Sequence, residues 1–67
     1  MKTIRDKFKL HRNGWTTSFE RQYHNGMITV TIRTDAGEVY DRIRCDDYRN
    51  AMDYWRAFNG IAKAVRS

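Results

Sequence analysis

Residues 15–44 read WTTSFERQYHNGMITVTIRTDAGEVYDRIR, and this stretch decides the fold. Apolar and polar residues alternate along it, which is the period of a half-buried β-strand. Turn signals interrupt the alternation at Asn25-Gly26 and at residues 35–38, and Asn13-Gly14 supplies another just before the stretch begins. Asn-Gly between alternating segments is the strongest short-range signal for a hairpin. The stretch therefore predicts an antiparallel meander.

Two-residue loops at both Asn-Gly pairs put apolar side chains of neighbouring strands on one face. At the first pair this rule places Phe8 opposite Phe19 and turns Leu10 to the same side. At the second pair it places Phe19 opposite Ile32. The two hairpins agree, so the sequence predicts one inner face that holds all four side chains.

The third turn extends the same face. Its parity places Val30 opposite Ile43 and Ile28 opposite Cys45, with Val39 following on the same side. Asp41 is the one poor fit on this face. We expect a bulge near Asp41 to resolve it.

After Asp46 the apolar period changes from that of a strand to that of a helix. Three- and four-residue spacing links Tyr48, Ala51, Met52, Trp55, Phe58, Ala62 and Val65. Asp46 or Asp47 can cap the start of this helix. Gly60 favours a stop or kink after Asn59, and the alternative is continuation to residue 66.

These patterns predict an α+β fold: an antiparallel meander of three to four strands followed by one C-terminal helix packed on one sheet face. We expect a single domain over 1–67, with strands at about 7–12, 15–23, 27–34 and 39–45 and a helix at about 47–59. Thr3 and Asp6 also fit a capping box, so a short N-terminal helix is the alternative to the first strand.

Charge and cysteine content narrow the class of protein. The chain has 67 residues, with 13 Lys and Arg against 8 Asp and Glu, and a formal net charge of +5. Such a field favours polyanions or acidic protein surfaces as partners. Cys45 is the one cysteine, and residues 1–10 offer no apolar stretch for export or membrane insertion. We expect a cytoplasmic protein that does not bind membranes.

The sequence offers no constellation for catalysis or metal binding. The two histidines fall on different turns, and Cys45 is expected beneath the helix, where a buried thiol is inert. Capping explains Asp46 and Asp47, and the glycines are scattered singly, without a phosphate-binding loop. We expect no catalytic site, no metal and no cofactor, and therefore a protein that acts by binding.

The sheet face away from the helix is predicted to be open and basic. By the registers above it carries Lys7, Lys9, His11, Thr16, Ser18, Glu20, Thr29, Thr31, Arg33, Tyr40, Arg42 and Arg44. We expect nucleic-acid binding, to DNA or RNA, with phosphate contacts from Lys7, Lys9, Arg33, Arg42 and Arg44 and base-side contacts from Thr29, Thr31 and Tyr40. The alternative is that Thr and Arg simply suit a solvated antiparallel face.

The plan resembles two DNA-binding families. Gly14-Trp15 enters a strand and Asp46-Asp47-Tyr48 opens the helix, in a layout similar to plant AP2-type domains and to the arm-binding domains of tyrosine recombinases. The resemblance lies in the plan and not in a shared motif. It implies DNA binding through the sheet face.

A second hypothesis gives the protein a protein partner. In size and type the chain resembles phage or mobile-element proteins that bind and inhibit a host protein or ribonucleoprotein complex, such as anti-CRISPR and host-takeover proteins. Tyr54, beside Arg49 and Arg56, has the composition of an interface hot spot, although Tyr54 can equally form the edge of the core. A homodimer through this helix or a strand edge stays open.

Overall fold

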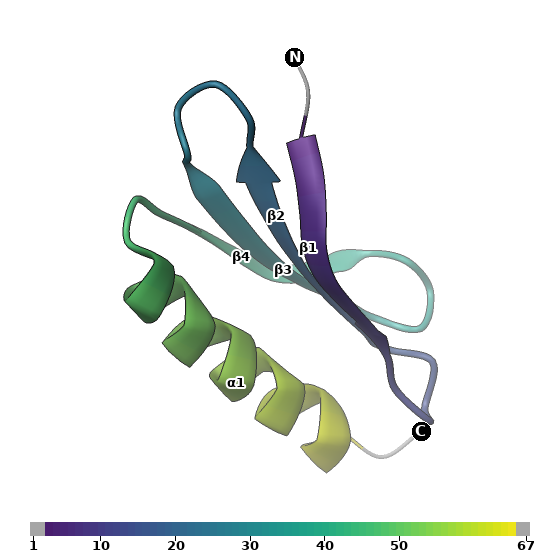
Figure 1. Cartoon of the computed structure of the whole chain (residues 1–67). Coiled ribbons are helices and arrows are strands. Elements are labelled where there is room, and N and C mark those ends of the chain that lie inside the picture. Colours follow the sequence, from purple (N-terminus) through teal and green to yellow (C-terminus); the bar gives the residue numbers. More distant parts are fainter. Residues whose placement is uncertain (1–2, 66–67) are drawn as a thin grey trace.

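Across residues 3–65, the part of the chain that the computed structural model describes, one four-stranded antiparallel sheet carries a helix on one face (Figure 1). The strands lie in chain order, and the elements are β1 (Thr3–Leu10), β2 (Thr16–Gln22), β3 (Ile28–Arg33), β4 (Val39–Cys45) and α1 (Tyr48–Ala64). The predicted α+β fold is confirmed. The N-terminal segment is a strand, so the alternative of a short helix there is wrong.

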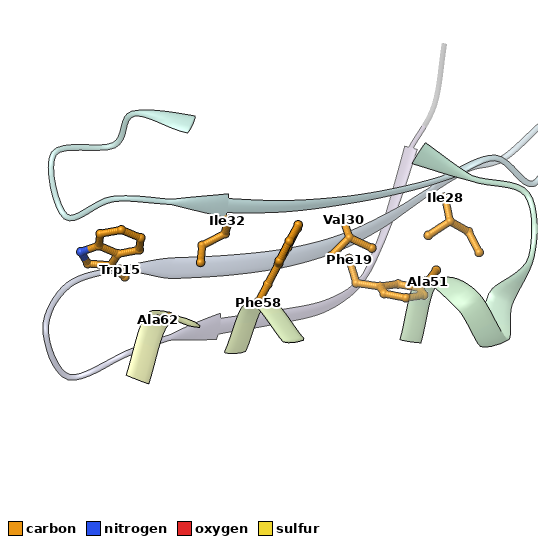
Figure 2. Close-up of a cluster of buried hydrophobic side chains, with 8 residues drawn as sticks. All are labelled: Trp15, Phe19, Ile28, Val30, Ile32, Ala51, Phe58 and Ala62. Carbon is orange, nitrogen blue, oxygen red and sulfur yellow. The ribbon is translucent and has the colours of Figure 1, made fainter. Parts of the chain in front are cut away.

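The core lies between the helix and the central strands, as Figure 2 shows. It consists of Trp15, Phe19, Ile28, Val30, Ile32, Ala51, Phe58 and Ala62. The sheet side comes from alternate residues of β3, from Phe19 of β2 and from Trp15 just before β2. These side chains share one face because successive side chains of a strand point to opposite faces. The helix packs on β2, β3 and β4, whereas in the described chain no Cα of β1 lies within 8 Å of α1. The helix side of β1 is therefore uncovered.

The helix begins as its sequence predicts and ends later than expected. Asp47 is the N-cap, and its carboxylate accepts a hydrogen bond from the backbone N–H of Arg49 at 3.2 Å. The helix continues through Gly60 to Ala64, so the predicted stop after Asn59 is wrong, and residue 66 lies outside the described residues. Since Ala62 is fully buried, packing of the last turn offsets the helix penalty of about 1 kcal/mol at a glycine. At 17 residues and with this composition, α1 is not a helix that could cross a membrane.

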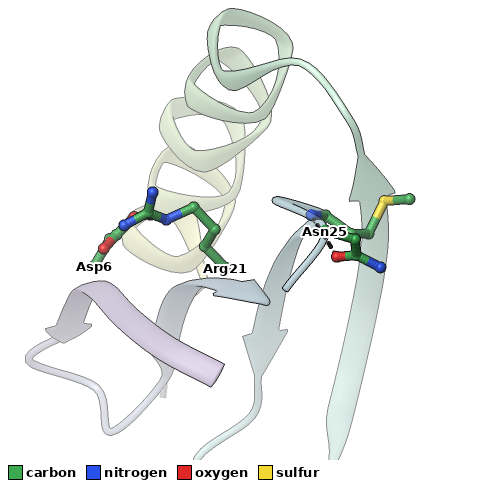
Figure 3. A network of polar contacts seen from close by, with 4 residues as sticks. Asp6, Arg21 and Asn25 are labelled. Carbon is green, nitrogen blue, oxygen red and sulfur yellow. Dashed lines mark hydrogen bonds and ion pairs between the residues drawn. The ribbon is translucent and has the colours of Figure 1, made fainter. Parts of the chain in front are cut away.

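The second hairpin keeps the predicted face with a different register. Its loop has four residues, 23–26, and the backbone N–H of Gln22 donates to Met27 at 2.8 Å. The Asn25 side chain accepts a hydrogen bond from the backbone N–H of Met27 (Figure 3). Phe19 consequently pairs with Val30 rather than Ile32. A shift of two residues preserves the side on which every side chain lies, so the inner face is as predicted.

The third hairpin follows the predicted register closely. Val30 pairs with Ile43, and Ile28 pairs with Cys45. The expected bulge is present beside Asp41, with Tyr40 as the extra residue. Val39 then pairs with Arg33, on the face away from α1, so its predicted inward position is wrong.

The first hairpin departs from the prediction in a way that changes the surface. His11 pairs with Trp15, through a hydrogen bond from the His11 N–H to the Trp15 carbonyl at 2.8 Å, so the loop has three residues instead of two. Phe8 is therefore opposite Ser18. A shift of one residue moves every side chain to the other face, and Phe8 and Leu10 point away from the helix. Their predicted place in the core is wrong.

Asn13 and Gly14 explain the longer loop. The Asn13 carboxamide donates to the carbonyls of Ala62 at 2.8 Å and Val65 at 2.9 Å, and its oxygen accepts from the Trp15 N–H. Gly14 has φ +92°, and a Cβ there would lie 2.9 Å from the Cβ of Asp35. The loop is thus held by the end of α1 on one side and the third turn on the other.

A bulge at Asp6 shifts the register of β1 by one more residue, so the residues before it lie on the faces that a two-residue loop would give them. The register shifts between Arg5 and Lys7, so Arg5 pairs with Glu20 while Lys7 pairs with Phe19. The Asp6 carboxylate lies 3.4 Å from Nε of Arg21 (Figure 3). Arg5 and Phe8 therefore share the face away from α1.

Candidate nucleic-acid interface

Paired residues of neighbouring strands place their side chains on the same face of the sheet. On the face away from α1, one row crosses from β1 to β4 through Arg5, Glu20, Thr29 and Arg44, and the next through Phe8, Ser18, Thr31 and Arg42. The rows enclose a hollow of about 320 Å³, which we call the outer groove. Its lining consists of Thr3, Arg5, Phe8, Thr16, Ser18, Glu20, Gln22, Thr29, Thr31, Arg33, Arg42 and Arg44.

The outer groove is strongly basic. Arg5, Arg33, Arg42 and Arg44 line it, against one acidic side chain, Glu20. All four arginines are exposed. Arg33 is partly engaged, since one of its terminal nitrogens donates to the Gly37 carbonyl at 3.0 Å. Four guanidinium groups on one hollow surface have the charge and hydrogen-bond donors that suit an anion with several charges.

Hydroxyl groups form the floor between the charges. Thr31 is buried at 4% exposure, and Thr16, Ser18 and Thr29 are half-buried. Each hydroxyl can donate to an oxygen acceptor and accept from a base N–H. The groove thus combines charged groups at the sides with neutral hydrogen-bonding groups at the centre.

Most of the predicted phosphate and base contacts meet in this groove. Arg33, Arg42, Arg44, Thr29 and Thr31 all line it. For these residues the predicted face is correct, because their strands kept the predicted parity.

The predicted sheet face is wrong for Lys7 and Lys9. Lys7 pairs with Phe19 and Lys9 with Thr17, so both lie on the helix side of the sheet. His11 is also misplaced in the prediction, because it is buried at 6% exposure. The physical reason in each case is the three-residue loop, which shifts β1 by one residue.

The predicted sheet face is also wrong for Tyr40. As the extra residue of the bulge it leaves the outer face, and its ring centroid lies 5.1 Å from that of Trp15. A bulge was expected nearby, but the pattern alone did not specify which residue would be the extra one.

Sequence reasoning missed Arg5 and Phe8. Both belong to the outer groove, and the Arg5 guanidinium carbon lies 4.9 Å above the centre of the Phe8 ring. The only sequence signal was the alternation of lysines with Phe8 and Leu10 in β1. This alternation shows that Phe8 and Leu10 share a face, but it does not show which face of the sheet that is. Only the loop length and the Asp6 bulge decide between them.

No family model, curated protein or solved structure matches this chain. Any assignment of function therefore rests on the groove and on the other exposed side chains.

The residues proposed for a protein interface are not brought together. At about 100° per residue, Arg49 and Arg56 lie on nearly the same side of α1, and Tyr54 lies well away from both. All three are exposed, but the Tyr54 ring is 6.5 Å from that of Phe58 and covers the edge of the core. The helix thus presents two arginines without an aromatic anchor between them.

Cys45 packs against the core cluster beneath α1, as expected. Burial raises the pKa of its thiol, and the carboxylates of Asp46 and Asp47 raise it further. A raised pKa disfavours the thiolate, which is the nucleophilic form. Within residues 3–65, no three His, Cys, Asp or Glu side chains are grouped so that they could hold a metal ion.

His11 begins a buried chain of hydrogen bonds that joins the sheet to the helix. Its Nε2 lies 3.3 Å from the Thr17 hydroxyl oxygen, and that hydroxyl donates to the Asn59 carboxamide oxygen. Since the Thr17 proton is used on Asn59, Nε2 of His11 is the donor to Thr17. Burial lowers the pKa of His11 below 6.5. Hydrogen bonding of the His11 side chain with Asn59 raises this pKa, but by less. Lys9 and Lys63 also lower this pKa.

Acidification should therefore destabilise the fold through His11. Because the folded pKa lies below the unfolded value of 6.5, the unfolded chain binds more protons in the interval between them. The contribution of neutral His11 to the free energy of unfolding is fully present well above pH 6.5, and it falls as the pH drops below 6.5. We expect the urea midpoint of the wild type to fall between pH 7.5 and 5.5 by more than that of His11→Gln, which keeps an N–H donor. Equal pH dependence in His11→Gln and the wild type would contradict this role.

Proposed function

We propose that the protein is a non-enzymatic module that binds nucleic acid, DNA or RNA, through the outer groove. The observation that carries the proposal is the gathering of four exposed arginines against one glutamate on a single hollow sheet face. Guanidinium groups bind phosphate oxygens through paired, charge-assisted hydrogen bonds, and contacts to phosphates supply a large share of the affinity of protein–nucleic-acid complexes. The hydroxyl floor adds neutral donors and acceptors for sugar or base edges.

The competing proposal is a phage or mobile-element protein that inhibits a host complex through α1. It has weaker support, because the Tyr54 ring packs near Phe58 and lies on a different side of α1 from Arg49 and Arg56. Two exposed arginines on a helix are an ordinary solvated surface, whereas four around a hollow are not. Cys45 is unpaired, which suits a reducing compartment, and we place the proposed activity in the cytoplasm.

A salt series tests the proposal. Labelled duplex DNA, single-stranded DNA and RNA are each titrated with the protein, with fluorescence anisotropy as the readout, from low to above physiological salt. We expect affinity for at least one form to persist at physiological salt and to fall linearly on a log–log plot. If binding to all three nucleic acids is lost well below physiological salt, nucleic acid is rejected as the partner and the host-protein proposal is favoured.

A further inference from the structure

Phe8 is an aromatic side chain that lies outside the hydrophobic core. It is 51% exposed, lies on the face away from the core and lines the outer groove. Its row leads across Ser18 and Thr31 to Arg42 on the far strand. An exposed phenyl ring beside cationic side chains offers a flat apolar surface within reach of groups that hold phosphates.

The contact of Arg5 with Phe8 shows that the ring face is accessible to a planar group. The guanidinium carbon sits 4.9 Å above the ring centroid, and Arg5 is itself exposed. A nucleobase is planar as well and has a larger stacking area. It can displace the guanidinium from the ring and leave Arg5 to stack on the second face of the base or to meet a phosphate.

The shape of the groove argues against a duplex as its ligand. Four strands about 4.8 Å apart make a sheet roughly 14 Å across. The major groove of B-form DNA is about 12 Å wide and admits a helix or a two-stranded ribbon. A four-stranded face is too wide to enter it, so Phe8 would not reach base edges through the major groove. In a single strand the bases are free to turn toward the protein.

We propose that the outer groove binds single-stranded nucleic acid, with one base stacked on Phe8 and the backbone phosphates on Arg42 and Arg44. This inference rests on the proposed function and specifies its ligand. The chemistry recognised, an unpaired base next to phosphates, is common to DNA and RNA.

Binding of oligo(dT), oligo(U) and a duplex of the same length, measured by anisotropy, tests the inference. Both single strands should bind more tightly than the duplex. Phe8→Leu keeps an apolar side chain but removes the ring, and it should weaken binding of the single strands by roughly tenfold without changing the salt slope. Leu10→Ala is the matched control, because Leu10 is 68% exposed on the same face but does not line the groove.

A spectroscopic readout separates stacking from a general effect on the surface. Phe8→Trp places an indole where the base would stack, and its fluorescence should be quenched by oligo(dT), beyond any change that the same oligonucleotide causes through Trp15 and Trp55 in the wild type. A tighter oligo(U) complex would identify RNA as the source of the ligand, and a tighter oligo(dT) complex would identify DNA; the stacking inference covers both.

The outcomes also separate this inference from the proposed function. Unchanged affinity in Phe8→Leu, or a duplex that binds more tightly than the single strands, would overturn the stacking inference. The proposed function would still stand if that binding depends on Arg42 and Arg44. If no nucleic acid binds at physiological salt, both are overturned.

Discussion

Replacing Arg42 and Arg44 by alanine together is expected to weaken nucleic-acid binding on the order of a hundredfold. In the proposed complex each guanidinium donates charge-assisted hydrogen bonds to a phosphate, and the loss of two such contacts would have an effect of this size. The two arginines lie on one edge strand and both line the outer groove. For a single-stranded ligand the salt dependence should also decrease, by about 1.4 in the log–log slope for two lost phosphate contacts. Anisotropy at several salt concentrations measures both quantities.

Lys7→Ala with Lys9→Ala is the control for net charge. This pair also removes two of the positive charges from the net +5, but from the helix side of the same sheet. If the groove is the site, the lysine pair should have only a small effect, and Glu20→Gln should strengthen binding by removing the one carboxylate of the lining. Equal losses in the arginine and lysine variants would mean that the whole charge of the molecule, and not the groove, attracts the ligand.

Phe19→Ala should destabilise the fold more than any surface substitution. Phe19 is completely buried, and its ring packs edge-on against Tyr48 at 5.4 Å and Trp55 at 6.3 Å between centroids. Truncation of a buried phenylalanine costs about 3–5 kcal/mol. A domain of this size has a free energy of unfolding of about 3–10 kcal/mol, so the loss is a large part of the total. Urea unfolding followed by circular dichroism measures it.

The same substitution at Phe8 should be nearly harmless to the fold. Phe8 is half exposed and touches Arg5 rather than the core, so Phe8→Ala is expected to change the free energy of unfolding by less than about 1 kcal/mol. A similar fall in the urea midpoint for both variants would mean that Phe8 supports the fold, and would remove the argument that its ring is there for a ligand.

The parts of the fold that the sequence predicted are those where local pattern and burial agree. Val30 and Ile43 face each other because both are apolar and one side of β3 must be covered. The same reasoning succeeded in the second hairpin despite a loop of the wrong length, because an error of two residues leaves each side chain on its face. Continuation of α1 past Gly60 was not predictable locally, because burial of Ala62 offsets the unfavourable glycine.

The candidate site could be predicted only on the strands whose faces were fixed by the core. Arg33, Arg42 and Arg44 follow from β3 and β4, whereas β1 receives no cover from α1 and has no buried side to fix its register. Its alternation of lysines with Phe8 and Leu10 fits either face equally well. The decision comes from Asn13 and the Asp6 bulge, whose contacts reach residues far away in the sequence.

The clamp that Asn13 forms on the end of α1 has a consequence for the order in which a growing chain can fold. Its partners, Ala62 and Val65, follow it by 49 and 52 residues. While the chain emerges from the ribosome, the first hairpin therefore exists for a long interval without the contacts that hold its three-residue loop. During that interval the register of β1 is held by contacts within the sheet and its turns, such as the Asp6–Arg21 ion pair and the hydrogen bond from the Trp15 N–H to Asn13. The contacts of Asn13 with Ala62 and Val65 add to these only when the last helical turn has emerged.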